Sequence, residues 1–143
     1  MNIRSAISKY AVAINALQTE GQALELPAMP ASAEAITLLA LSQAGSRILL
    51  WLHDSAERQE QAHRDLLTLR AKQSPEIAYF PQWDALPRPD TQHDPEIAGL
   101  RLRVLQSCRA IPRKDPLIIV ASIQALLQTC LEPEALEETT LTI

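Results

Sequence analysis

The chain has 143 residues, of which 47% are hydrophobic and 21% charged, and its formal net charge is −4 at pH 7. This size and composition indicate one ordinary globular domain. The acidic balance argues against a dedicated nucleic-acid-binding module, because such modules hold phosphates with clustered Lys and Arg. No apolar run approaches the roughly 20 residues that cross a bilayer. Cys108 and Cys130 show neither metal-ligand nor disulfide spacing, so we expect reduced core thiols in a cytoplasmic protein.

The first third of the chain alternates helix and strand patterns. Residues 1–20 place apolar side chains at steps of three and four, which predicts an amphipathic helix. Residues 22–27 predict a short strand, and Ser32 is expected to cap a mostly apolar helix that ends at Gly45. The apolar run over residues 47–54 is typical of an interior parallel strand covered on both faces.

Two longer helices follow recognisable start signals. Ser55 is expected to cap a surface helix over residues 56–72. Asp94 fits an N-cap with Pro95 at the first helical position of a helix over residues 95–111. The buried edge of the first helix would consist of Ala62, Leu66 and Leu69.

Two further strands complete the pattern. Residues 77–81 and 117–122 are short apolar runs, and Ser122 is expected to cap a short helix over residues 123–131. Strands that alternate with helices predict an α/β fold, with a parallel sheet between helix layers in a three-layer arrangement. A free sheet edge near the end of the chain would favour pairing with a second copy as an edge-strand homodimer.

The turn after the first expected strand reads PAMPASAEA over residues 27–35. A phosphate-binding loop needs glycines, so that backbone N–H groups can surround the phosphate, and commonly a lysine. This turn has neither, and its two prolines lack an N–H group. We therefore expect no nucleotide at this position.

Other chemistry-bearing residues have structural explanations. Asp90, His93 and Asp94 lie close together, but Asp94 is accounted for as a cap and His93 as a solvated loop residue. His53 fits a strand end, and His63 fits an exposed helix face. We predict no catalytic, cofactor-binding or metal-binding residues.

The stretch FPQWDALPRPDTQHDPE over residues 80–96 contains the only Phe, one of two Trp and four of ten Pro. Such a proline-rich loop loses little conformational entropy on folding and can hold a defined surface. Trp83 is either an exposed anchor for a partner or a lid packed over the strand ends.

Two arginines lie early in the helix that begins at Pro95, where the helix dipole does not favour positive charge. They are Arg101 and Arg103. The structural interpretation for both is an ion pair with Asp90, Asp94 or Glu96, and the functional one is contact with a nucleic acid or a protein. Direct DNA binding would use Arg88, Arg101, Arg103, Arg113 and Lys114.

Three blocks in order resemble the N-terminal region of bacterial transcription-repair coupling factors. They are YFPQWDALP (79–87), HDPEIAGLRLRVL (93–105) and IIVASIQALLQ (118–128). The family carries F-P-x-W-E-T-L-P, P-E-I-x-x-x-R-L-x-x-L and V-V-x-S/T-V-x-A-L-L-Q elements at comparable spacing. Asp84 and Ala85 replace the usual Glu and Thr, and Arg88-Pro89 stand where Tyr and an acidic residue are common.

The resemblance implies a domain similar to the first domain of the helicase component of the bacterial excision nuclease, P-loop-NTPase-like but with a degenerate phosphate loop. This domain would occupy residues 21–143 and follow the helix of residues 1–20, within a longer multidomain chain. The implied function is a non-catalytic scaffold and interaction domain. The parent protein would displace stalled RNA polymerase with an ATP-driven DNA translocase motor. It would also recruit nucleotide excision repair through the damage-recognition component of the excision nuclease.

The family motifs suggest a set of interface residues without a cofactor. They are Phe80, Pro81, Trp83, Asp84, Leu86, Pro87, Arg88, Glu96 and Arg101. The alternative function is a small stand-alone flavodoxin-like ligand-binding domain or enzyme, which would use the strand ends near Ser122 and Asp84.

Overall fold

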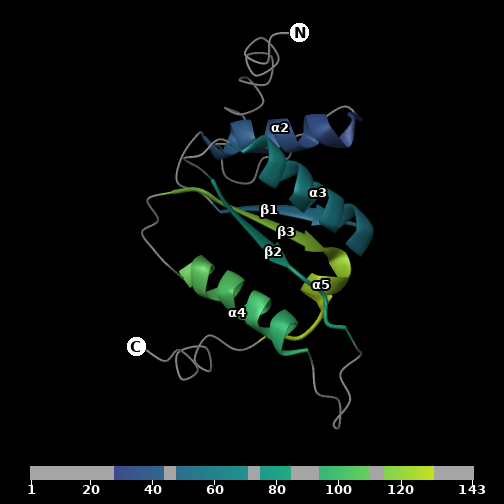
Figure 1. Cartoon of the computed structure of the whole chain (residues 1–143), viewed down its shortest axis with the longest axis vertical. Helices are drawn as coiled ribbons and strands as arrows, with labels where there is room; N and C mark the ends of the chain where they lie inside the picture. Colours follow the sequence, from purple (N-terminus) through teal and green to yellow (C-terminus); the bar gives the residue numbers. More distant parts are fainter. Residues whose placement is uncertain (1–27, 44–47, 71–74, 85–93, 110–114, 131–143) are drawn as a thin grey trace.

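Figure 1 shows the computed structural model of the chain, which describes residues 28–43, 48–70, 75–84, 94–109 and 115–130. The expected N-terminal helix, the expected first strand, the expected helix end at Gly45 and the C-terminal end lie outside the described residues. The loop between the second strand and the following helix is described only in part.

Three strands form a parallel sheet in the order β1-β3-β2. They are β1 (Ile48–His53), β2 (Glu76–Phe80) and β3 (Leu117–Ser122). Among the described residues both β1 and β2 pair with β3, so the last of these three strands along the chain lies between the other two. The three strands expected in this part of the chain, and the α/β class, are confirmed.

Four helices accompany the sheet in the described residues. They are α2 (Ala31–Ser42), α3 (Ala56–Leu69), α4 (Pro95–Arg109) and α5 (Ile123–Leu127). Figure 1 shows α2 and α3 on one side of the sheet and α4 on the other, which is a small open three-layer arrangement. The short helix α5 continues directly from β3.

The core on the α3 side joins two helices to the sheet. Ala62 and Leu66 of α3 pack against Ile118 and Val120 of β3, and Ala35 of α2 closes the cluster. Burying a Leu, Ile or Val side chain fully contributes about 1.5–3 kcal/mol, so these few contacts hold the layer together.

The core on the α4 side uses the alternate residues of β3. Leu117 and Ile119 point to this side, where they pack with Phe80 and with Val104 of α4. Cys108 packs partly buried against the same cluster. Because every residue of β3 is buried, both faces of this strand serve as core.

Local helix signals are mostly confirmed. The side chains of Ser55, Asp94 and Ser122 each accept a hydrogen bond from a backbone N–H two or three residues later, at 3.3, 2.8 and 3.2 Å. The expected cap at Ser32 is wrong, because the helix begins at Ala31, with Pro30 at the N-cap position and no side-chain cap. The pyrrolidine ring of Pro30 fixes its φ, which is −60°, but supplies no side-chain acceptor.

Two expected details of helix burial and length are wrong. Leu69, the last residue of α3, is 43% exposed and does not belong to the buried cluster of Ala62 and Leu66. The helix after Ser122 is shorter than expected and ends at Leu127, since Gln128 has an extended backbone conformation.

The expectation that β1 is covered on both faces is also wrong. Among the described residues β1 pairs only with β3. Its alternate residues Ile48, Leu50 and Leu52 are 42%, 51% and 45% exposed. They lie on the α4 side of the sheet, where the buried core consists of residues from β2, β3, α4 and α5.

Leu50 and Ile119 form a matched pair for testing this asymmetry, since they are register partners and differ in burial. We expect Ile119→Ala to lower the free energy of unfolding by about 2–5 kcal/mol, because it leaves a cavity in the core. Leu50→Ala is expected to cost less than about 1 kcal/mol, because much of its side chain is already in water. Urea denaturation of both variants measures the difference, and equal losses would show that β1 is covered.

Candidate functional site at the carboxyl ends of the strands

Three segments that are distant in sequence meet beyond the carboxyl ends of β2 and β3. They are the residues that follow β2, the middle of α4 and the end of α5. Arg101 of α4 connects them, and only 3% of its surface is exposed. Parallel α/β sheets commonly bind ligands at this edge, so the hydrogen-bond partners of the polar groups here show which of them could bind a ligand.

The Arg101 guanidinium donates hydrogen bonds mainly to backbone carbonyls. Its Nη1 donates to the Pro81 carbonyl at 2.6 Å and to the Ala125 carbonyl at 3.4 Å. Its Nη2 donates to the Ala125 and Thr129 carbonyls at 3.4 and 3.2 Å and to Cys130 Sγ at 3.3 Å. One side chain therefore fixes the chain after β2 to both ends of the segment from α5 onward.

Aromatic rings enclose the same guanidinium. Its carbon lies 4.2 Å from the centroid of the Phe80 ring and 4.6 Å from that of the Trp83 ring, which are cation–π distances. The Trp83 backbone N–H donates to Gln128 Oε1 at 2.6 Å, and its indole N–H donates to the Thr129 carbonyl at 3.2 Å. Trp83 thus packs over the strand ends as a lid, half-buried.

The expected ion pair of Arg101 with an acidic side chain is wrong for the described residues. Neither Asp94 nor Glu96 is among its partners, and Asp90 lies outside the described part of the chain. Burial lowers the pKa of Arg101 and the neighbouring Cys130 partly opposes this, but an arginine stays charged in proteins. The arginine is also too deeply buried to lie on a DNA-binding surface.

The remaining motif residues are placed apart from this cluster. Asp84 is exposed directly after Trp83, and Glu96 is exposed in the first turn of α4. Leu86, Pro87 and Arg88 lie outside the described residues. Cys130 is exposed, so the expectation of a core thiol is wrong for it. The described candidate interface residues thus divide into a group packed around Arg101 and two exposed residues, Asp84 and Glu96.

Gln59 is an organising residue that the sequence analysis missed. It is fully buried, and its Nε2 donates to the carbonyls of Phe80 and Val120 at 2.7 and 3.0 Å. These bonds tie the ends of β2 and β3 together from the α3 side. A signal for it exists in the sequence, because Gln59 shares the helical face of Ala62 and Leu66, where a polar residue must find buried partners.

His53, the last residue of β1, is the second residue that the sequence did not single out. It is 9% exposed, its ring lies 4.7 Å from the Trp51 ring, and its Nε2 is buried without a hydrogen-bond partner. Burial lowers the pKa of His53 most strongly, with Arg58 acting in the same direction against Glu34 and Asp54. The imidazole is therefore neutral near pH 7.

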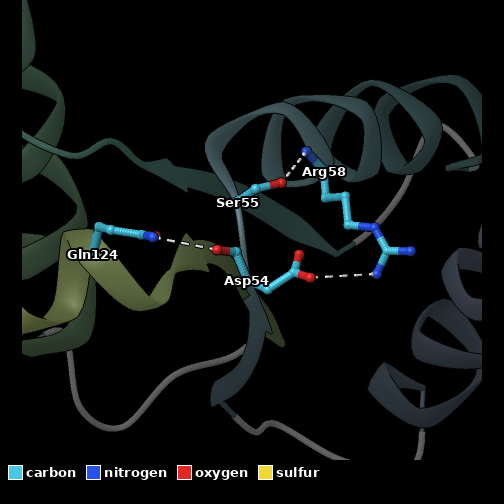
Figure 2. A network of polar contacts seen from close by, with 4 residues as sticks. All are labelled: Asp54, Ser55, Arg58 and Gln124. Atoms are coloured by element: carbon cyan, nitrogen blue, oxygen red, sulfur yellow. Dashed lines mark hydrogen bonds and ion pairs between the residues drawn. The ribbon is translucent and has the colours of Figure 1, made fainter.

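Polar contacts after His53 join β1 to two helices (Figure 2). Arg58 lies 3.8 Å from the Asp54 carboxylate, and its backbone N–H donates to Ser55 Oγ. On the other side Gln124 Nε2 donates to the Asp54 carbonyl at 3.3 Å. Since the Arg58 and Asp54 side chains are 74% and 68% exposed, this ion pair orients the loop more than it stabilises the fold.

The described residues offer little catalytic chemistry at this edge. The Ser122 hydroxyl accepts the capping hydrogen bond and is fully buried. No group of three or more His, Cys, Asp or Glu in the described ranges could hold a metal ion. Within the same part of the chain, no helix is long and apolar enough to cross a membrane. The arrangement holds backbone segments together more clearly than it activates a substrate.

Comparison of the chain with protein-family models, with curated proteins and with solved structures gave no match in any of the three.

Replacing Arg101 should destabilise the fold at this edge. We expect Arg101→Ala to lower the free energy of unfolding by about 2–4 kcal/mol, because buried carbonyls lose their donor and two rings lose their contact. Arg101→Lys keeps the charge but not the forked donor geometry, and should cost about 1–2 kcal/mol. Urea denaturation followed by Trp fluorescence measures both values.

Arg103, two residues away in the same helix, is the control because it is exposed. Its replacement by Ala should change stability by no more than about 0.5 kcal/mol. If Arg101→Ala cost no more than Arg103→Ala, the guanidinium would not hold the three segments together.

Two histidines make stability depend on pH. Burial lowers the pKa of His53 and of His63, whose ring lies 5.1 Å from the Tyr79 ring, below the ordinary 6.5. The unfolded chain then binds more protons than the folded chain, so stability is full above pH 6.5 and falls as pH drops from there toward the folded pKa values. The slope is at most about 1.4 kcal/mol per pH unit for each histidine.

Urea denaturation between pH 7.5 and pH 5.5 tests this dependence. The double variant His53→Gln/His63→Gln should lose less stability over that interval than the unmodified chain does. An unchanged slope in the double variant would assign the pH dependence to other groups.

Proposed function

We propose that the chain is a non-catalytic scaffold and interaction domain of the kind found at the N-terminus of transcription-repair coupling factors. The observation that carries the proposal is that the three family-like blocks meet in one cluster. Pro81 and Trp83 come from the first block, Arg101 from the second, and Ala125 and Gln128 from the third. The three blocks that carry the family resemblance are thus joined to one another by hydrogen bonds.

The use of the strand ends supports an interaction role over catalysis. At the edge where α/β domains usually hold ligands, Ser122 caps a helix, Gln59 binds two strand carbonyls and Arg101 binds three more. The Ser122 hydroxyl, the Gln59 amide nitrogen and the Arg101 guanidinium are thus engaged within the fold, while Gln59 Oε1 is buried without a partner. A stand-alone flavodoxin-like enzyme is less well supported, because its proposed Ser122 hydroxyl is buried and engaged.

The start of α2 supports a degenerate phosphate site. Pro30 occupies the N-cap position without a side-chain cap, and the acidic residue of the first turn is Glu34. A negative side chain there repels a phosphate, and proline supplies no N–H group to it. The start of α2 is therefore a poor setting for nucleotide binding.

The proposal extends to the parent protein. That protein would be a cytoplasmic ATP-dependent DNA translocase whose motor, RNA polymerase contact and DNA contact lie in other domains. The damage-recognition component of the excision nuclease would be reached through the parent as well. In this domain the exposed motif residues Asp84 and Glu96 would contact neighbouring domains, and an edge-strand homodimer is a further proposed contact.

Isothermal titration with ATP and Mg²⁺ tests the non-catalytic role. We expect no binding at about 1 mM nucleotide, because the turn before α2 has two prolines that lack N–H groups and has no glycine and no cation for the phosphates. A dissociation constant in the micromolar range would contradict the proposal.

The gene that encodes this chain provides an independent check, because the proposal requires a longer coding sequence. A helicase motor encoded downstream is the expected outcome. A gene that encoded no such motor would overturn the assignment to a coupling factor, whatever the titration showed.

A further inference from the structure

A small pocket lies at the carboxyl end of β1, where the first turns of α2 and α3 approach each other. Its volume is about 130 Å³, and its polar wall consists of Glu34, His53, Arg58 and Gln61. Met29 forms part of the apolar wall. The pocket is distinct from the Arg101 cluster, which lies beyond the ends of β2 and β3.

His53 gives the pocket an unsatisfied polar atom. Its side chain lines the pocket and is nine-tenths buried, and its Nε2 has no hydrogen-bond partner. Buried polar atoms are nearly always paired, and of the two unpaired ones among the described residues, His53 Nε2 and Gln59 Oε1, only His53 belongs to a residue that lines this pocket. A neutral imidazole can present one nitrogen as an acceptor to a donor group that enters the pocket.

Charge in the pocket favours a cationic group. Among the described residues no ion pair involves Glu34, whereas Arg58 is paired with Asp54. Figure 2 shows the Arg58 side chain reaching toward the Asp54 carboxylate. The charged groups that act on His53 are therefore two carboxylates and one paired guanidinium, which leaves a net negative environment.

A second, larger pocket shares a wall with the first. Its volume is about 350 Å³, and Met29 and Glu34 line both pockets. The rest of its wall is mainly apolar and includes Leu38, Leu41 and Trp51. A polar pocket with an unpaired carboxylate thus adjoins an apolar pocket large enough for a side chain such as leucine. We call the two together the α2–β1 groove.

We propose that the α2–β1 groove binds a segment of a partner protein that presents a basic side chain next to an apolar one. The basic group donates hydrogen bonds to the Glu34 carboxylate and to His53 Nε2, and the apolar side chain enters the pocket formed by Leu38, Leu41 and Trp51. The inference rests on the proposed function as an interaction domain and names the partner chemistry that one of its surfaces fits. Two adjoining pockets match two neighbouring side chains better than one small ion.

Titration of the ¹⁵N-labelled chain with the peptide acetyl-Ala-Leu-Arg-Ala-amide, followed by NMR, tests the proposal. We expect shifts of the Trp51 indole N–H and the Glu34 backbone N–H signals at millimolar peptide. The matched peptide acetyl-Ala-Leu-Gln-Ala-amide should bind about tenfold more weakly, because it lacks the charge that pairs with Glu34. Equal affinities for the two peptides would overturn the proposal.

Two variants separate the groove from general charge effects. Glu34→Gln should weaken binding of the Arg peptide about tenfold and leave binding of the Gln peptide within about twofold. Glu57→Gln removes one charge from an exposed residue of α3 that lines neither pocket, and should leave both affinities within about twofold. An equal loss in both variants would contradict a specific contact with Glu34.

A third arm uses 3-methylbutylamine, which carries a similar apolar group and an ammonium without a peptide backbone. Tighter binding of this amine than of the Arg peptide would overturn the proposed protein partner in favour of a small amine. No shift at about 10 mM Arg peptide would overturn the groove proposal altogether. Neither result would contradict the proposed scaffold function. ATP binding, or a gene without a motor, would contradict the scaffold function without contradicting peptide binding in the groove.

Discussion

The packing of the Arg101 guanidinium is the constraint on which the rest of this edge depends. A charged group that is 3% exposed must have its N–H groups satisfied, or its burial would cost several kcal/mol. The chain meets this demand with backbone carbonyls and two aromatic rings. Carbonyls can serve only if their segments keep a fixed path, so the arginine and the loop order each other. This explains why a short helix of five residues, α5, can be followed by an extended segment with a defined course.

On each side of the sheet, a different side chain binds backbone carbonyls at or beyond the ends of β2 and β3. Gln59 binds the ends of β2 and β3 from the α3 side, while Arg101 binds the chain beyond them from the α4 side. At the end of β1, Gln124 Nε2 donates to the Asp54 carbonyl, while His53 Nε2 is unpaired and lines a pocket. Gln59 Oε1 is also buried without a partner, but Gln59 lines neither of the two pockets described above. The end of β1 thus combines an unpaired polar atom with a pocket. This contrast is why the groove beside β1, and not the Arg101 cluster, is the place for a ligand.

Sequence reasoning predicted the parts of the fold that depend on local signals. Ser55, Asp94 and Ser122 are caps because their side chains accept bonds from nearby N–H groups, which needs no tertiary information. The exposed face of β1 could not be predicted in this way, since an apolar run does not show which of its side chains a helix will cover. The partners of Arg101 come from 20 to 29 residues away, and they are mostly carbonyls, which any sequence supplies. The burial of Gln59 could have been predicted, because this polar residue shares a helical face with Ala62 and Leu66.

The exposed row on β1 connects the fold to the proposed role. Ile48, Leu50 and Leu52 carry no charge or proline that would protect an edge strand from pairing, although natural edge strands usually have such protection. Leu126 and Leu127 of α5 add further exposed apolar surface at the carboxyl end of the sheet. A domain that worked alone would gain solubility from polar residues at these positions. An apolar strand that is left uncovered beside firmly closed strand ends is therefore better suited to packing against another domain or a second copy, and this supports a role in assembly over one in catalysis.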